Sequence, residues 1–195
     1  MIANIDAWLG RYIELLHKRG QLDNTLIVYS SDHGEMLGDY GQWQKLSPLQ
    51  SSIGVPLIVA GPGIAQQTPN HAPITTLYLH ATFLDIAGVD PGDVDSQSML
   101  PLFADETDRH REAVCSGLSA WRLAYDGRYK LIRGYHPAQR SGGHAWEPMA
   151  VDLHDARALQ RDRPLYLYDT ATNGQNNLVE NFPDIVAQLD AHLTT

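Results

Sequence analysis

The feature that most constrains the fold is the run Thr25–Tyr29, in which five consecutive residues are apolar or β-branched. A run without polar alternation is typical of a strand covered on both faces, as in a parallel sheet. Asp32 and His33 follow it, and Gly34 allows the backbone to turn sharply away. Because open α/β sheets form their sites at the carboxyl ends of strands, a carboxylate and an imidazole there suit a metal ion. The pair alone leaves a second interpretation open, in which Asp32 caps a turn and His33 is an ordinary loop histidine.

The sequence around this pair resembles one known family. A glycine-rich loop leads to Lys45, thirteen positions after Asp32, and Val55–Gly63 reads Val-Pro-Leu-Ile-Val-Ala-Gly-Pro-Gly. Together these motifs make residues 24–63 similar to the sulfatases of the alkaline phosphatase superfamily. The resemblance continues at residues 74–88, which resemble a helix of that family, and at residues 127–132 and 167–169, which resemble two of its late strands.

The resemblance implies an enzyme that hydrolyses small-molecule sulfate esters. It makes Asp32 and His33 two ligands of one divalent cation and Lys45 a catalytic, sulfate-contacting lysine. Calcium is the usual metal in sulfatases, while a histidine ligand also suits manganese or zinc. Such groups are needed because sulfate ester cleavage places negative charge on the transferring group and the leaving oxygen. A phosphonate or phosphate ester hydrolase of the same superfamily uses the same positions and is the alternative.

Part of such a site is missing from these 195 residues. The family's nucleophile is a formylglycine made from the first residue of Cys/Ser-x-Pro/Ala-x-Arg, and the sequence contains no such motif. Cys115 has neither the proline nor the arginine, so we expect it to be a small buried core residue. We therefore expect the C-terminal portion of a sulfatase that is inactive alone, with the formylglycine in an N-terminal part. A non-catalytic domain that binds without turnover is an alternative of a different class.

The pattern of apolar residues predicts an α/β chain in two parts. Residues 1–105 are expected to form the end of a helix-flanked, largely parallel sheet, and residues 106–195 a small antiparallel sheet with a C-terminal helix. Asp126-Gly127 is expected to be a two-residue hairpin turn. Residues 134–163 have no clear period, and we expect them to be disordered or to wall the pocket. The expected helices are 2–19, 75–87 and 183–193, and the expected strands are 25–29, 56–60, 112–116, 121–125, 128–133 and 164–169.

Charge and hydropathy narrow the possible partners. The net charge is −9 and the lysines and arginines form no run, which argues against nucleic acid. No apolar stretch approaches the roughly twenty residues of a membrane span, so no membrane partner is expected. Without the expected N-terminal part, the chain should expose apolar surface, and we expect it to associate with itself through that surface.

Overall fold

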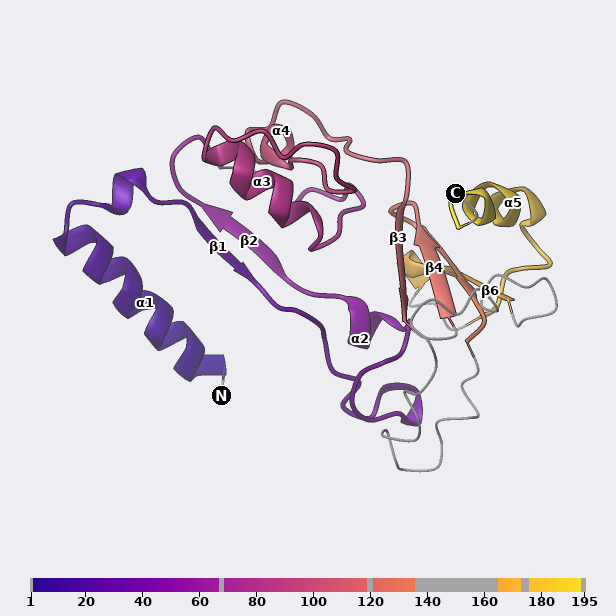
Figure 1. The fold of residues 1–195 in the computed structure, drawn as a ribbon. Coiled ribbons are helices and arrows are strands. Elements are labelled where there is room, and N and C mark those ends of the chain that lie inside the picture. The colour runs from indigo at the N-terminus through magenta and orange to yellow at the C-terminus, as the bar shows by residue number, and fades with distance from the viewer. Residues whose placement is uncertain (1, 67–68, 119–120, 136–164, 173–175, 194–195) are drawn as a thin grey trace.

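The computed structural model of the chain describes residues 2–66, 69–118, 121–135, 165–172 and 176–193 (Figure 1). Its helices are α1 (Ile2–Lys18), α2 (Gln50–Ile53), α3 (Tyr78–Ile86), α4 (Leu100–Phe103) and α5 (Pro183–Ala191). Its strands are β1 (Ile27–Ser30), β2 (Leu57–Ala60), β3 (Val114–Leu118), β4 (Trp121–Tyr125), β5 (Tyr129–Arg133) and β6 (Leu165–Asp169). The expectation for residues 134–163 falls, beyond residue 135, outside the described residues.

The first strand pair differs from the prediction. β1 and β2 pair antiparallel, with Ile27 opposite Ala60 and Ser30 opposite Leu57, so the described residues do not show the predicted parallel sheet. The run Thr25–Tyr29 is half-buried rather than covered on both faces. An unbroken apolar run indicates burial, but the direction of a neighbouring strand depends on how the chain returns to it. Here the chain returns through α2, and the two strands lie side by side between α1 and α3 (Figure 1).

The second sheet is the antiparallel sheet that the sequence predicted. Its strands follow one another in the order β3-β4-β5-β6, and side chains alternate between its two faces. One face packs on α5 through a cluster formed by Ala124, Leu131, Leu167 and Leu189. The opposite face packs on the loop after β1 through a cluster formed by Met36, Leu49, Trp121, Leu123, Ile132 and Tyr135. This second contact holds the loop that carries the predicted lysine, Lys45.

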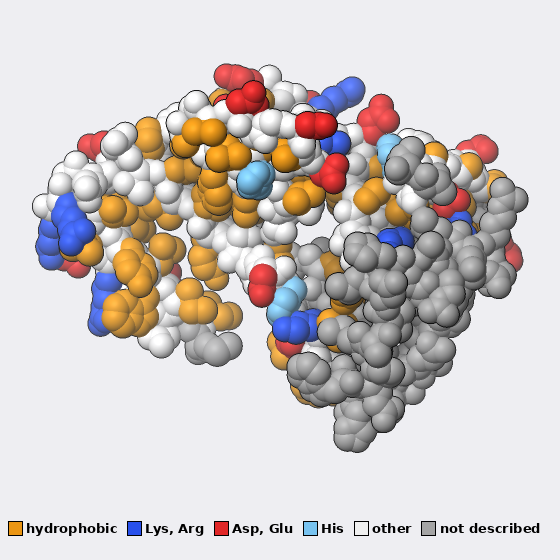
Figure 2. All heavy atoms as spheres, viewed as in Figure 1, with side chains coloured by type: hydrophobic (Ala, Val, Ile, Leu, Met, Phe, Trp, Pro, Cys, Tyr) orange, Lys and Arg blue, Asp and Glu red, His pale blue; other side chains and the backbone are white. Residues whose placement is uncertain are grey.

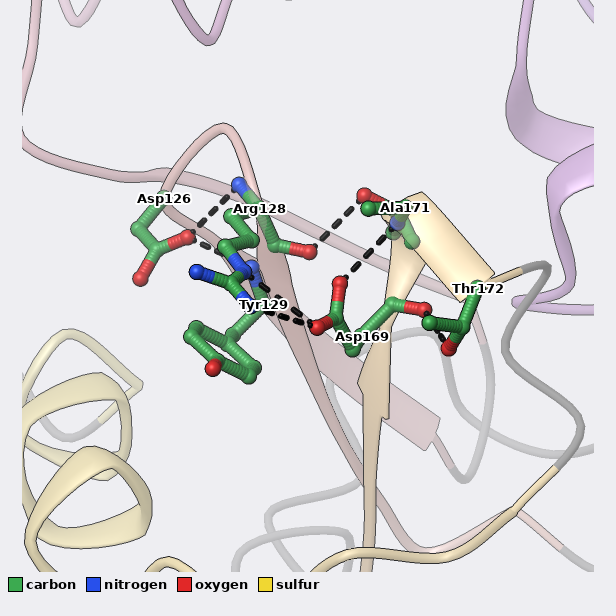
Figure 3. Close-up of polar contacts among 7 residues, drawn as sticks. Asp126, Arg128, Tyr129, Asp169, Ala171 and Thr172 are labelled. Atoms are coloured by element: carbon green, nitrogen blue, oxygen red, sulfur yellow. Dashed lines mark hydrogen bonds and ion pairs between the residues drawn. The ribbon is translucent and has the colours of Figure 1, made fainter.

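The hairpin between β4 and β5 is tied to the end of β6 (Figure 3). The main-chain N–H of Asp126 donates to the carbonyl of Tyr129, so the turn residues are Gly127 and Arg128, one position beyond the prediction. Gly127 has a φ of 100°, in the left-handed region that favours glycine. The Arg128 guanidinium donates to Oδ2 of Asp169 from Nε at 3.2 Å and from Nη2 at 2.9 Å. These hydrogen bonds hold the pKa of Asp169 below its usual value.

Cys115 is not the core residue that the sequence suggested. It is exposed on β3, which is an edge strand of the sheet and is shielded by a neighbouring strand on one side only. Its Sγ donates to the carbonyl of His192 at 3.4 Å. The prediction failed because an apolar strand pattern does not distinguish an edge strand from a central one.

α1 forms where it was predicted, yet none of its residues is buried. Ile2 is 83% exposed, Tyr12 60% and Trp8 49%, and Figure 2 shows hydrophobic side chains open to solvent in this part of the molecule. The apolar face of α1 is thus left without a packing partner among the described residues. Nor does any helix in the described ranges combine the length and the hydrophobicity needed to cross a membrane.

Candidate active site

The three residues predicted for the site lie together at the end of β1. Lys45 Nζ lies 2.7 Å from Nε2 of His33, and Oδ2 of Asp32 lies 3.5 Å from the same nitrogen. Figure 2 shows an acidic, a histidine and a basic side chain next to one another near the centre of the view. The chain therefore brings a carboxylate, an imidazole and an ammonium group to one point.

The contacts of the His33 ring define which nitrogen can act as a ligand. Nδ1 lies 2.8 Å from the carbonyl oxygen of Gly34. Because a carbonyl only accepts hydrogen bonds, we assign the ring hydrogen to Nδ1. Nε2 then carries the lone pair, beside the Lys45 ammonium that donates to it. A histidine whose Nδ1–H is held by a backbone carbonyl is oriented as metal-ligating histidines commonly are.

Asp32 supplies an anionic oxygen. Its Oδ1 accepts from the main-chain N–H of His33 at 2.9 Å and from the Ser31 hydroxyl at 3.4 Å. These interactions, led by the His33 N–H, lower the pKa of Asp32, so its carboxylate is charged at neutral pH. A carboxylate oxygen beside an unprotonated imidazole nitrogen fits calcium, manganese or zinc as part of a shell. Within the described ranges no third histidine, cysteine, aspartate or glutamate completes a cluster, so the pair supplies only that part.

Gly34 brings α2 against the site. Its N–H donates to the carbonyl of Ser52 at 2.7 Å, and a Cβ at this position would collide with the backbone carbonyl of Ser51. Gly34 is not among the residues with positive φ. The glycine is thus required by a close approach of two backbone segments rather than by a sharp turn.

The loop that carries Lys45 is strained and held in place by the second sheet. Gln44 and Leu46, on either side of the lysine, have φ angles of 67° and 79°, a region that costs free energy for residues other than glycine. The indole N–H of Trp121 donates to the carbonyl of Leu46 at 3.2 Å. The hydroxyl of buried Tyr135 donates to Oε1 of Gln42, in the same loop, at 2.9 Å. Residues far along the chain therefore fix where Lys45 lies.

A pocket of about 490 Å³ adjoins these residues. Its volume lies in the range of small-molecule sites, roughly 300–1,000 Å³. Asp32, His33 and Lys45 line it together with one face of the sheet β3-β4-β5. Hydroxyl side chains contribute to the remaining wall, namely Ser30, Ser47, Ser52, Thr75, Thr76 and Ser116. The arrangement can therefore place a polar small molecule against the carboxylate, imidazole and ammonium groups.

The structure adds Lys130 to this pocket, a residue that the sequence reasoning missed. It lies in β5 and is only 4% exposed. Alternation along the predicted strand offered a signal, since Lys130 shares a face with Ile132, which is fully buried. A lysine on the inward face of a strand is unusual enough to mark a site.

Comparison with known proteins places this fold in one family. Residues 1–89 match the family model of the sulfatases. This part of the chain therefore belongs to the sulfatase family, which implies the alkaline phosphatase superfamily.

Relatives extend the likeness beyond residue 89. Arylsulfatase K of Rattus norvegicus is 39% identical over 208 residues, an alignment that covers 99% of this chain and 33% of the relative. Choline-sulfatase of Rhizobium meliloti (strain 1021) is 38% identical over 105 residues and covers 53% of this chain and 20% of the relative. The chain thus spans about a third or less of the length of these curated relatives.

Two solved structures share the fold. One is the protein BT4656, solved in complex with its substrate D-glucosamine-2-N,6-O-disulfate. Its TM-score is 0.75 at 24% identity, and the match covers 99% of this chain and 38% of the BT4656 chain. The phosphonate monoester hydrolase of Silicibacter pomeroyi has a TM-score of 0.74 at 25% identity, covering 97% and 38%. Nearly all of this chain therefore follows the fold found in both structures.

Proposed function

We propose that this chain is the C-terminal portion of a sulfuric ester hydrolase. In this proposal Asp32 and His33 hold part of a divalent metal site, and Lys45 contacts the sulfate. Residues 1–105 belong to its catalytic domain and residues 106–195 form its C-terminal subdomain. The observation that carries the proposal is the convergence of Lys45 Nζ and Asp32 Oδ2 on Nε2 of His33, at 2.7 Å and 3.5 Å, beside a pocket of small-molecule size.

The chemistry of sulfate ester hydrolysis explains this set of groups. Negative charge develops on the sulfate oxygens and on the leaving oxygen, and a fixed ammonium group such as that of Lys45 stabilises it. When bound, the divalent cation would add further stabilisation of the same charge. Calcium is the metal we expect, and manganese or zinc are compatible with the His33 nitrogen. The formylglycine nucleophile would come from outside these 195 residues.

Hydrolysis of phosphonate or phosphate esters is the second candidate function. It is supported by the 25% identical phosphonate monoester hydrolase, whose fold this chain shares at a TM-score of 0.74. Both reactions need a cation, a lysine and an anionic ester, so Asp32, His33 and Lys45 do not separate them. Comparing the turnover of an aryl sulfate with that of an aryl phosphonate by the longer enzyme decides between the two functions. A domain that binds an anionic ester without turnover would bind both compounds and hydrolyse neither.

Calorimetric titration of calcium and manganese into the chain tests the metal assignment. We expect weak binding, because part of the ligand shell is absent and water completes the coordination. Asp32→Ala should abolish it, whereas Asp23→Ala, which removes an exposed carboxylate in the turn Leu22–Asn24, should not. Sub-micromolar binding that survives Asp32→Ala would show that the metal site lies elsewhere.

A further inference from the structure

Lys130 is a buried cation that has no counter-ion among the residues that the structure describes. The residue is 4% exposed, and burial lowers the pKa of its ammonium group to about 8. Its side chain makes no hydrogen bond or ion pair with any described residue. Lysines are almost never this buried unless they are paired, because removing a charge from water without a partner is costly. An anionic ligand in the pocket would supply such a partner.

The residues beside Lys130 do not balance its charge. Its partners across the sheet are Tyr125 in β4 and Tyr168 in β6. The hydroxyl of Tyr125 donates to the carbonyl of Gly127, and burial raises the pKa of Tyr168 to about 12. The phenol of Tyr168 is therefore neutral at physiological pH. No described residue balances the charge of Lys130, and an anion that enters the pocket it lines would do so.

Lys130 and Lys45 lie toward different ends of the pocket. Trp121 begins β4 and donates to the carbonyl of Leu46, the residue next to Lys45. Lys130 pairs with Tyr125 at the far end of the same strand. Tyr125 lies four positions after Trp121, about 13 Å away along the strand at ~3.3 Å per residue. The two lysines are therefore anchored toward opposite ends of β4.

The pocket carries more positive than negative charge, although the chain as a whole is acidic. Among the described residues that line it, Lys45 and Lys130 are cationic and Asp32 is anionic. The Asp32 carboxylate accepts from the main-chain N–H of His33 and lies at the Lys45 end of the pocket, 3.5 Å from the His33 ring. No carboxylate of the described lining is left for the Lys130 end. A ligand with an anionic group at each end would match this distribution of charge.

We propose that Lys130 binds a second anionic group, a carboxylate or a second sulfate, on the alcohol part of the ester. The enzyme then prefers sulfate esters that carry two negative groups. This inference rests on the proposed function, since Lys45 binds the sulfate that is cleaved. Lys130 is thus a specificity-determining residue, contributed by β5 to a site whose other cation follows β1.

Three ligands separate the possible anions: phenyl sulfate, 4-carboxyphenyl sulfate and benzene-1,4-disulfate. Their dissociation constants are measured by calorimetry on the 195-residue chain and on Lys130→Met, Lys45→Ala and Lys18→Met. Lys18 lies in α1, is exposed and pairs with Glu14, so its variant is the matched control. In parallel, NMR of the lysine side chains follows the pKa of Lys130 with each ligand, a readout that does not depend on any variant.

We expect the doubly anionic ligands to bind at least about tenfold more tightly than phenyl sulfate, the scale of one charge-assisted hydrogen bond. Lys130→Met should remove that ratio and Lys18→Met should keep it. Both doubly anionic ligands should raise the Lys130 pKa more than phenyl sulfate does. The ligand that causes the larger rise identifies the preferred anion. An unchanged ratio in Lys130→Met, or equal pKa values with all ligands, would overturn the inference. If instead Lys45→Ala leaves phenyl sulfate binding unchanged, the proposed function fails, whatever happens at Lys130.

Discussion

The indole Nε1 of Trp121 donates a hydrogen bond to the main-chain oxygen of Leu46 at 3.2 Å, across 75 positions of sequence. This bond joins the first residue of β4 to the neighbour of Lys45. The second sheet therefore does more than cover a core: it fixes the loop that carries the lysine of the site. Substitutions in the second sheet should therefore alter the stability of that loop and, through it, the position of Lys45.

Trp121→Phe should destabilise the chain by about 1–3 kcal/mol, from the lost hydrogen bond and the smaller ring in a packed cluster. Trp121 is 7% exposed, whereas Trp43 is 71% exposed. Trp43→Phe is thus the matched control and should change the free energy of unfolding by less than about 0.5 kcal/mol. Urea denaturation of the three proteins measures both values. Equal stabilities for the two variants would mean that the contact to Leu46 contributes nothing.

Lys45→Ala should lower the turnover of a complete enzyme containing this chain by about a hundredfold or more, the scale for losing one charge-stabilising donor. Substrate size should have little influence, because Lys45 acts on the sulfate group itself. The measurement is the rate with a small aryl sulfate, with Lys18→Ala as the control for loss of an exposed lysine. A near-normal rate in Lys45→Ala would return Lys45 to the role of a solvated surface residue.

The chain alone should not hydrolyse sulfate esters. It contains part of a metal site and a lysine, but no motif for a formylglycine nucleophile, and groups that act as a unit lose nearly all activity when one is missing. The assay is an aryl sulfate with added calcium or manganese. Turnover that Asp32→Ala abolishes would demand a nucleophile within these 195 residues.

Much of the second sheet could be predicted from the sequence, and the partner of β1 could not. Alternating residues and a glycine turn define β4 and β5 locally, so the predicted strand at residues 121–125 matches the structure. The pairing of β1 with β2 depends on the path of the chain between Ser30 and Leu57. Local patterns carry no information on that path, and the same limit made Cys115 look buried when it lies on an edge strand.

Some residues of the candidate site could likewise be predicted from the sequence, and others could not. Asp32, His33 and Lys45 could be named because they follow one strand in a motif of fixed spacing. Trp121 and Lys130 are brought to the candidate site from segments far away in sequence, so no spacing between residues predicts their place there. For Lys130, the inward face of a strand was the only local sign, and its meaning depends on the pocket that the fold places against it.

Self-association should occur through α1. Its residues Trp8 and Tyr12 lie one turn apart, with ring centroids 6.3 Å from each other, and both are exposed. Trp8→Glu combined with Tyr12→Glu should shift the chain from dimers or larger species to monomers, because burying a carboxylate in an apolar contact is costly. Sedimentation velocity measures the change, and Trp43→Glu controls for the loss of an exposed tryptophan elsewhere. Monomers in the unmodified chain at high micromolar concentration would contradict this expectation.

Stability should rise with pH across the interval in which Lys130 titrates. The unfolded chain keeps this ammonium protonated up to the ordinary pKa of 10.5, whereas in the folded chain it loses its proton above about 8. Between these values the unfolded state binds more protons, so raising the pH favours the folded state. Over the whole interval the gain is about 3 kcal/mol, at ~1.4 kcal/mol for each unit of pKa. Below pH 8 both states are protonated and this contribution stays constant.

Lys130→Met removes this contribution, so the variant should be more stable than the wild type near pH 7 and should lose that advantage as the pH approaches 10.5. The pKa of Tyr168, raised to about 12, keeps that neighbour out of the interval. Urea denaturation at steps from pH 7 to 10.5 gives both curves, with Lys18→Met as the exposed control. The difference between wild type and Lys130→Met isolates Lys130 from other groups that titrate in this range. If the free energies of unfolding of these two proteins change with pH in parallel, the Lys130 ammonium is not desolvated. The argument for an anionic partner in the pocket would then fail.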